Sequence, residues 1–116
     1  MLKRPEVEVR FSFLRKGLIM NAEICKAISN KSIAKFNYHG ETRIVEPHCH
    51  GMSSKGNEVL RGYQTGGGSV SGNPSPWRLF KVNDISSLEI TNNNFDGPRT
   101  DYNPNDKNMV NICCCL

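Results

Sequence analysis

Hydrophobic residues recur with a helical period in only one part of the chain, close to residue 20. Asn21 is a favourable N-cap and Glu23 suits the first turn of a helix. One apolar stripe follows from the spacing of Met20, Ile24, Ala27 and Ile28. The polar residues 29–32 end this pattern, so the sequence predicts one short helix.

From residue 33 the hydrophobic period changes to two, which is typical of strands. Alternation predicts strands over residues 33–38, 42–51, 57–65, 77–82 and 86–91. Turn-forming residues separate them at 39–41, 53–56 and 83–84, and residues 66–76 form a glycine-rich loop without a phosphate-loop lysine. One helix before five short strands predicts a mainly β (α+β) domain built as a small barrel.

The chain divides into three segments, of which 20–91 carries the predicted domain. Residues 1–19 are either an N-terminal arm or strand, or a stretch before the true start at Met20. The second interpretation arises because Arg15-Lys16-Gly17 can be encoded by purine-rich codons resembling a bacterial ribosome-binding site. Residues 92–116 are turn-rich, so this tail is either partly ordered or laid across the barrel by Phe95, Tyr102 and Met109.

The composition says more about the cellular environment of the protein than about its function. A chain of 116 residues with 22% charged residues fits one ordinary domain. Charged residues interrupt the apolar runs of the first twenty residues, so we expect neither a signal peptide nor a membrane span. Five cysteines, an odd number, make a poor disulfide framework and favour the reducing cytoplasm. The net charge of +4 is compatible with an anionic partner but does not require one.

The stretch TRIVEPHCHG, residues 42–51, concentrates residues that bind metals. In a regular strand His48 and His50 share one face, whereas Cys49 points away. A closed zinc site needs further ligands from a second segment, and only Cys113, Cys114 and Cys115 are candidates. Three adjacent cysteines do not all converge without strain. We therefore expect no metal site, no cofactor and no stoichiometric zinc.

Catalysis and lipid attachment are also not expected. The chain has no nucleophile elbow and no convincing acid pair, so we do not expect an enzyme. The final CCCL matches a prenylation box only formally, because its middle positions are not aliphatic.

Basic and aromatic residues on the predicted strands are the better candidate for binding. Small barrels bind single-stranded nucleic acid by stacking bases on aromatic rings and pairing phosphates with arginine. Arg61 and Tyr63 share one face by alternation, as do Trp77 and Lys81, whereas Arg78 points the other way with Phe80. The alternative is that Trp77 and Phe80 belong to the core and that the arginines are solvated.

The order of these segments resembles a WYL domain over residues 27–90. The first matching features are a strand ending in Phe36-Asn37-Tyr38 and an arginine before Val-Glu-Pro in residues 43–47. A strand closing on Leu60-Arg61-Gly62-Tyr63 and the segment from Arg78 to Ile85 follow in the same order.

This resemblance implies an Sm-like (SH3-like) five-stranded barrel preceded by one short helix. WYL domains usually follow a helix-turn-helix in bacterial regulators and are thought to sense nucleotide or nucleic-acid ligands. The resemblance implies a ligand site lined by Tyr38, Arg43 and Arg78. Two positions depart from the pattern. Only Leu60 survives of the tripeptide that names the family, here Glu58-Val59-Leu60, and Asp84 stands where arginine is usual.

We therefore expect a stand-alone, cytoplasmic, bacterial WYL-like regulatory module. Its expected partner is a nucleotide or single-stranded nucleic acid, with a regulator or nuclease encoded nearby as a further partner. Candidate ligand-binding residues are Tyr38, Arg43, Arg78, Arg61, Tyr63 and Lys81. The alternative is a protein-interaction module that binds no small ligand and docks through an exposed edge strand.

The hypothesis of a start at Met20 predicts that the first nineteen residues add nothing to the fold. A chain beginning at Met20 should then express and melt like the full chain, as measured by circular dichroism. A large drop in melting temperature would show that residues 1–19 belong to the folded domain.

Overall fold

The chain forms one antiparallel sheet and one short helix in a computed structural model that describes residues 22–69 and 74–116. The predicted arm, Met20 and Asn21 lie outside the described residues. The helix covers residues 22–30. The strands are β1 (Ser32–Tyr38), β2 (Glu41–Met52), β3 (Glu58–Gly67), β4 (Trp77–Lys81), β5 (Ile85–Asn94) and β6 (Asn111–Cys115), with the 3-10 turn η1 (Val82–Asp84) between β4 and β5. Within the described ranges no helix has the length and apolar character needed to cross a bilayer.

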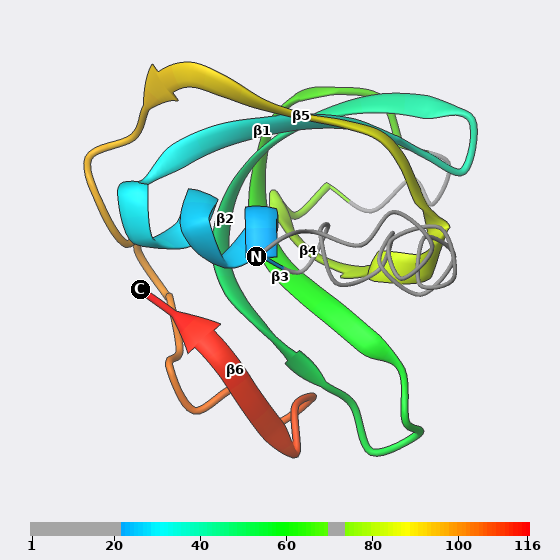
Figure 1. Cartoon of the computed structure of the whole chain (residues 1–116), viewed down its shortest axis with the longest axis vertical. Helices are drawn as coiled ribbons and strands as arrows, with labels where there is room; N and C mark the ends of the chain where they lie inside the picture. Colours follow the sequence, from blue (N-terminus) through cyan, green and yellow to red (C-terminus); the bar gives the residue numbers. More distant parts are fainter. Residues whose placement is uncertain (1–21, 70–73) are drawn as a thin grey trace, which may run out of the picture.

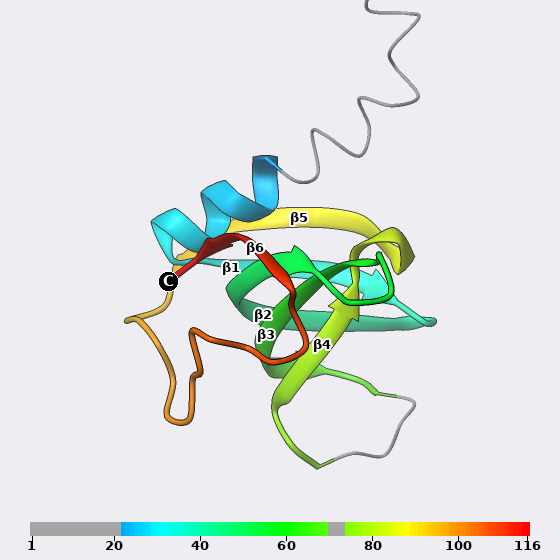
Figure 2. The same cartoon turned by 90° about the horizontal axis from the view of Figure 1, so that it is seen from below.

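β2 is the central strand of the sheet. The strand order is β4-β3-β2-β1-β5, and β6 also pairs with β2. β1 pairs with the first half of β2, from Glu41 to Val45, and β6 pairs with its last part, from Cys49 to Met52. Figure 1 shows the sheet curving strongly, with β6 (red) beside the lower part of β2. The view from below shows the helix above β1 and close to β6 (Figure 2).

A tight turn places the end of β1 directly beside the start of β2. Tyr38 pairs with Glu41, so only His39 and Gly40 connect the strands. Both have positive φ, at 51° and 81°, as a two-residue type I′ hairpin turn requires. This turn brings Tyr38 and Arg43 close together in space.

The main core lies on the concave side of the sheet and is closed by the helix. Ile24 and Ile28 of the helix pack into one cluster with strand residues that include Phe36, Leu60 and Phe80. The rings of Phe36 and Phe80 meet edge to face, 5.0 Å apart. The stripe predicted for the helix is confirmed at Ile24, Ala27 and Ile28, which are all buried.

β2 contains an irregularity at His48 that separates the two histidines. The register with β3 shifts between Pro47 and Cys49. His48 packs against Trp77, Phe95 and Tyr102, whereas His50 lies beside Cys114. The expectation that both histidines share one face is therefore wrong. It assumed a regular pleat, and a bulge interrupts the pleat next to Pro47.

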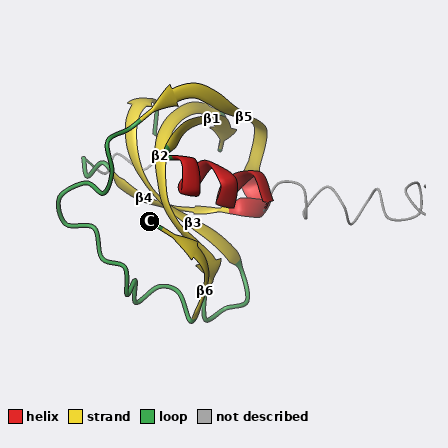
Figure 3. Ribbon diagram, turned by 60° about the vertical axis from the view of Figure 1, so that its left-hand side comes forward, coloured by secondary structure: helices red, strands yellow, loops and turns green. Residues whose placement is uncertain are grey.

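His48 holds the segment after β5 against the sheet. Its Nδ1–H donates to the carbonyl of Glu46 at 2.8 Å, and its Nε2 accepts the backbone N–H of Arg99 at 3.1 Å. The guanidinium of Arg99 also donates twice to the Glu46 carboxylate, at 2.8 Å each. In Figure 3 this segment is the long loop that runs from β5 around the sheet to β6.

The fold class predicted from the sequence, a mainly β domain with one short helix and a barrel-like sheet, is confirmed. The tail adds a sixth strand, β6, to the five predicted strands. Four cysteines form the disulfides Cys25–Cys114 and Cys49–Cys115, and Cys113 is free and exposed. The expectation of no disulfide framework is therefore wrong, because Cys114 and Cys115 alternate on β6 and meet different partners.

The role of His48 predicts a pH-dependent stability. Burial lowers the pKa of His48 below its ordinary value of about 6.5, and this outweighs the hydrogen bond to Glu46, which raises it. The unfolded chain then binds a proton before the folded chain does. Stability is complete above about pH 6.5 and falls as the pH drops below that value.

Urea unfolding between about pH 7 and pH 5 will test this expectation. His48→Gln cannot titrate, so its free energy of unfolding should fall less steeply over that range than that of the parent. His39 and His50 are unchanged between the two proteins, so any contribution they make is common to both. Parallel pH profiles in the two proteins would show that His48 does not couple protonation to folding.

Candidate functional site

Tyr38 is the residue around which most of the predicted ligand-binding residues gather. Its side chain is buried, and its ring stacks on His39 and meets the edge of Phe80. The hydroxyl accepts the backbone N–H of Lys81 at 3.0 Å, and the carbonyl accepts Nη2 of Arg43 at 3.1 Å. Tyr38 thus joins β1 to the start of β2 through its backbone carbonyl and to the end of β4 through its hydroxyl.

Arg43, which the WYL resemblance assigns to a ligand site, is buried. Only 3% of its surface is exposed. Its Nη1 donates to Gln64 Oε1 at 3.3 Å, and its Cζ lies 5.3 Å from the centre of the Tyr38 ring. The buried Nε has no hydrogen-bond partner among the described residues. This guanidinium therefore supports Tyr38 and keeps one donor unused.

Arg78 lies near Arg43, so the two cations share one region. Arg78 pairs with Gly62 across β3 and β4, two positions before Phe80, so it points to the concave side that Phe80 occupies. Burial and the nearby Arg78 charge lower the pKa of Arg43, whereas Glu41 and Tyr38 act in the opposite direction. The orientation of Arg78 with Phe80, predicted from alternation, agrees with this pairing.

A surface groove of about 320 Å³ opens beside Tyr38 and carries positive charge. Three of its lining residues are lysines, Lys55, Lys81 and Lys107, and none is acidic. Its remaining polar lining residues are Ser53, Ser54, Asn57 and Asn108. The β2–β3 turn, β4 and the tail therefore build one basic surface next to Tyr38.

Arg61 and Tyr63 do not line this groove and contact the tail instead. Arg61 donates through Nε to Asp106 at 2.7 Å and through Nη2 to Asn108 at 2.8 Å. Burial raises the pKa of Asp106, but the hydrogen bonds from Arg61 and the Asn108 backbone outweigh it and lower the pKa overall. Tyr63 lies under the guanidinium of Arg99, with 4.4 Å between Cζ and the ring centre.

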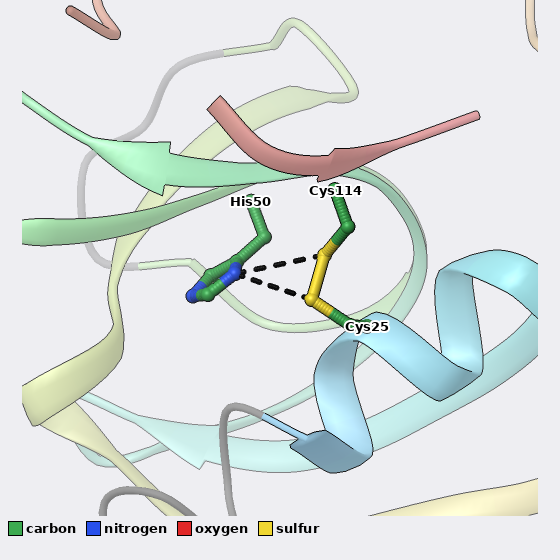
Figure 4. A group of neighbouring side chains, drawn as sticks. All are labelled: Cys25, His50 and Cys114. Carbon is green, nitrogen blue, oxygen red and sulfur yellow. Dashed lines mark hydrogen bonds between the residues drawn. A yellow bond between two sulfur atoms is a disulfide. The ribbon is translucent and has the colours of Figure 1, made fainter. Parts of the chain in front are cut away.

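A second cluster joins the helix to β2 and β6, and the sequence indicated only two of its three members, His50 and Cys114. It consists of Cys25, His50 and Cys114, and their ligand atoms all lie within 4.8 Å of one another (Figure 4). Cys25 was missed because no nearby residue in the sequence marks it as part of a site. The three segments come together only in the folded chain.

Comparison with known proteins identifies the fold but no family. No protein-family model and no curated protein sequence matches the chain significantly. One solved structure is similar, the proteasome accessory factor B/C (PafBC) of Arthrobacter aurescens, with a TM-score of 0.58 and 22% identity. The match covers 74% of this chain but 13% of PafBC. The relation is one of fold. It is distant, and it is consistent with a WYL-like domain.

The burial of Arg43 predicts that this residue stabilises the domain. Arg43→Ala removes the donor that satisfies the Tyr38 carbonyl and should lower the free energy of unfolding by roughly 1–3 kcal/mol. Lys35→Ala is the matched control, because Lys35 is an exposed cation on β1 and its loss should change stability by less than about 0.5 kcal/mol. Urea unfolding measures both, and equal stabilities would show that Arg43 is not a structural residue.

Proposed function

We propose that this chain is a WYL-like regulatory module that binds an anionic ligand, and that it does so without catalysis. The fold relation to PafBC, a regulator that contains a WYL domain, supports the regulatory part of this proposal. The chain corresponds to a small part of PafBC, so the proposal concerns only a module of this kind.

The observation that carries the anion proposal is the gathering of positive charge around Tyr38. Arg78 lies close enough to Arg43 to disfavour the charge of Arg43, and Glu41 offsets this only in part. An anion bound there would relieve the repulsion and accept a hydrogen bond from Nε of Arg43. The lysine-lined groove adds further positive charge beside Tyr38, on the face of β4 that carries Lys81.

Nucleotides and single-stranded nucleic acid are the proposed ligand class. His39 covers the Tyr38 ring at 4.1 Å between ring centres, and about half of the His39 side chain is exposed. A base can stack on that outer face while its phosphate meets Lys81. The base therefore stacks on His39 in this proposal. It does not stack on Tyr38, because His39 already covers the Tyr38 ring.

The second candidate function is a protein-interaction module without a small ligand. Val110 and Ile112 are large hydrophobic residues that are 61% and 46% exposed. Both lie on or next to β6, for which the described residues provide pairing only with β2. An edge strand with exposed apolar residues favours docking of a partner chain.

Fluorescence anisotropy with labelled single-stranded DNA, RNA and mononucleotides will test the anion proposal. Binding should weaken as salt rises, because each neutralised phosphate releases counterions. Arg78→Ala and Lys81→Ala should each weaken binding by about 1–3 kcal/mol, the range for loss of a charge-assisted hydrogen bond. Lys35→Ala removes the same charge elsewhere and should bind like the parent.

Thermal melting of each variant separates loss of binding from loss of fold. No binding by the parent at low salt, or equal binding by Arg78→Ala, Lys81→Ala and the parent, would contradict the proposal. In that case the protein-interaction function becomes the better supported candidate.

A further inference from the structure

The cluster of Cys25, His50 and Cys114 has the composition of a metal site. Cys25 comes from the helix, His50 from β2 and Cys114 from β6, and in Figure 4 the imidazole faces both sulfur atoms. His50 is buried, whereas both cysteines are partly exposed, which leaves a path for an ion. Two thiolates and one imidazole are ligands that Zn²⁺ prefers.

The two nitrogen–sulfur distances in the cluster match a tetrahedral zinc centre. Zn–S and Zn–N bonds of about 2.3 Å and about 2.0–2.1 Å at tetrahedral angles place nitrogen about 3.6 Å from each sulfur. Nδ1 of His50 lies 3.6 Å from Sγ of Cys25 and 3.7 Å from Sγ of Cys114. In the disulfide form the sulfurs are bonded to each other, so they must separate to about 3.8 Å around zinc. Rotation about the χ1 bonds of the two cysteines supplies this movement.

His50 is oriented as a metal-binding histidine by a carboxylate. Its Nε2 lies 2.5 Å from Oε2 of Glu58. In the neutral imidazole Nε2–H donates to Glu58, so the Nδ1 lone pair points toward the sulfurs. Disulfide sulfurs carry no proton and cannot donate to this buried lone pair. A cation bound between Nδ1 and two thiolates provides a partner for this lone pair.

We propose that Cys25, His50 and Cys114 bind one Zn²⁺ when the two cysteines are reduced, with Glu58 as the positioning residue. A fourth coordination position stays open to water or to another ligand. The earlier expectation of no metal site was argued for His48 and His50 together, which the bulge separates. The cluster proposed here uses only one of these histidines and adds Cys25.

Reduction by a cellular dithiol converts the disulfide form into the zinc-binding form. The Cys25–Cys114 S–S bond breaks and its two sulfurs gain two electrons and two protons from the dithiol, which closes into its own disulfide. Zn²⁺ then displaces the two thiol protons to solvent. The disulfide and the zinc ion therefore link the helix to β6 as alternatives, each under its own redox condition.

Elemental mass spectrometry on the full chain will test this proposal. The protein is reduced, incubated with ZnCl₂ and desalted, and about one zinc per chain is expected, against none for the disulfide form. Cys25→Ser, Cys114→Ser and His50→Ala should each lose the zinc. Cys113→Ser removes an exposed thiol next to the cluster, and Cys49→Ser with Cys115→Ser removes the other pair. Both of these control proteins should keep the zinc.

A second measurement tests the proposal even if some of these variants fail to fold. Reduced parent protein titrated with Co²⁺ should show thiolate-to-cobalt absorption and the visible bands of a tetrahedral ion. Glu58→Gln should keep these bands but weaken metal affinity about 10–100-fold, as is usual for loss of a residue that orients a ligand. No zinc in the reduced parent, or zinc that depends on Cys113, Cys49 or Cys115, would overturn the proposal.

Discussion

The pairing of β2 with three other strands is the constraint on which the rest of the structure depends. β1, β3 and β6 all bond to this strand, so its course decides which residues face the core and which face the tail. The register shift at His48 divides it into two parts. Before the shift, Arg43 and Val45 point into the core. After the shift, His50 faces the helix and β6, whereas His48 contacts the tail. One local irregularity thus places the basic cluster and the cysteine–histidine cluster on one strand without mixing their residues.

The sequence predicts well what short-range patterns determine. Alternation identified five strands within a few residues of their bounds; β1 shows the alternation of buried and exposed residues clearly, whereas β2 is buried on both faces from Val45 to Gly51. The turn at His39 and Gly40 placed Arg43 beside Tyr38, since the partner strand begins two residues later. Alternation also set Arg78 on the side of Phe80. These features follow from residues that are neighbours along the chain.

Features that depend on distant residues were not predictable in this way. β6 is short and follows a turn-rich segment, and its position is set by pairing with β2 more than fifty residues earlier. Its close approach requires Gly51, where a Cβ would lie 2.2 Å from the Asn111 carbonyl oxygen. The burial of Arg43 was also missed, because arginine is usually solvated and only Tyr38 and Gln64 together make its burial tolerable.

The two departures from the WYL pattern acquire physical roles in this chain. Glu58 stands at the first position of the tripeptide that names the family, and there its carboxylate orients His50. Asp84 stands where arginine is usual, and it accepts a hydrogen bond from Nε2 of His39 at 3.2 Å. Each acidic residue therefore fixes one histidine, and the two histidines belong to the two candidate sites. His50 contacts Glu58 through one ring nitrogen and faces Cys25 and Cys114 with the other, so the acid lies beside the cysteine–histidine cluster. His39 with Asp84 covers Tyr38 and keeps that ring from direct contact with solvent. The ligand proposed for the Tyr38 surface would therefore meet an imidazole held by a carboxylate, where the WYL resemblance implies a further arginine.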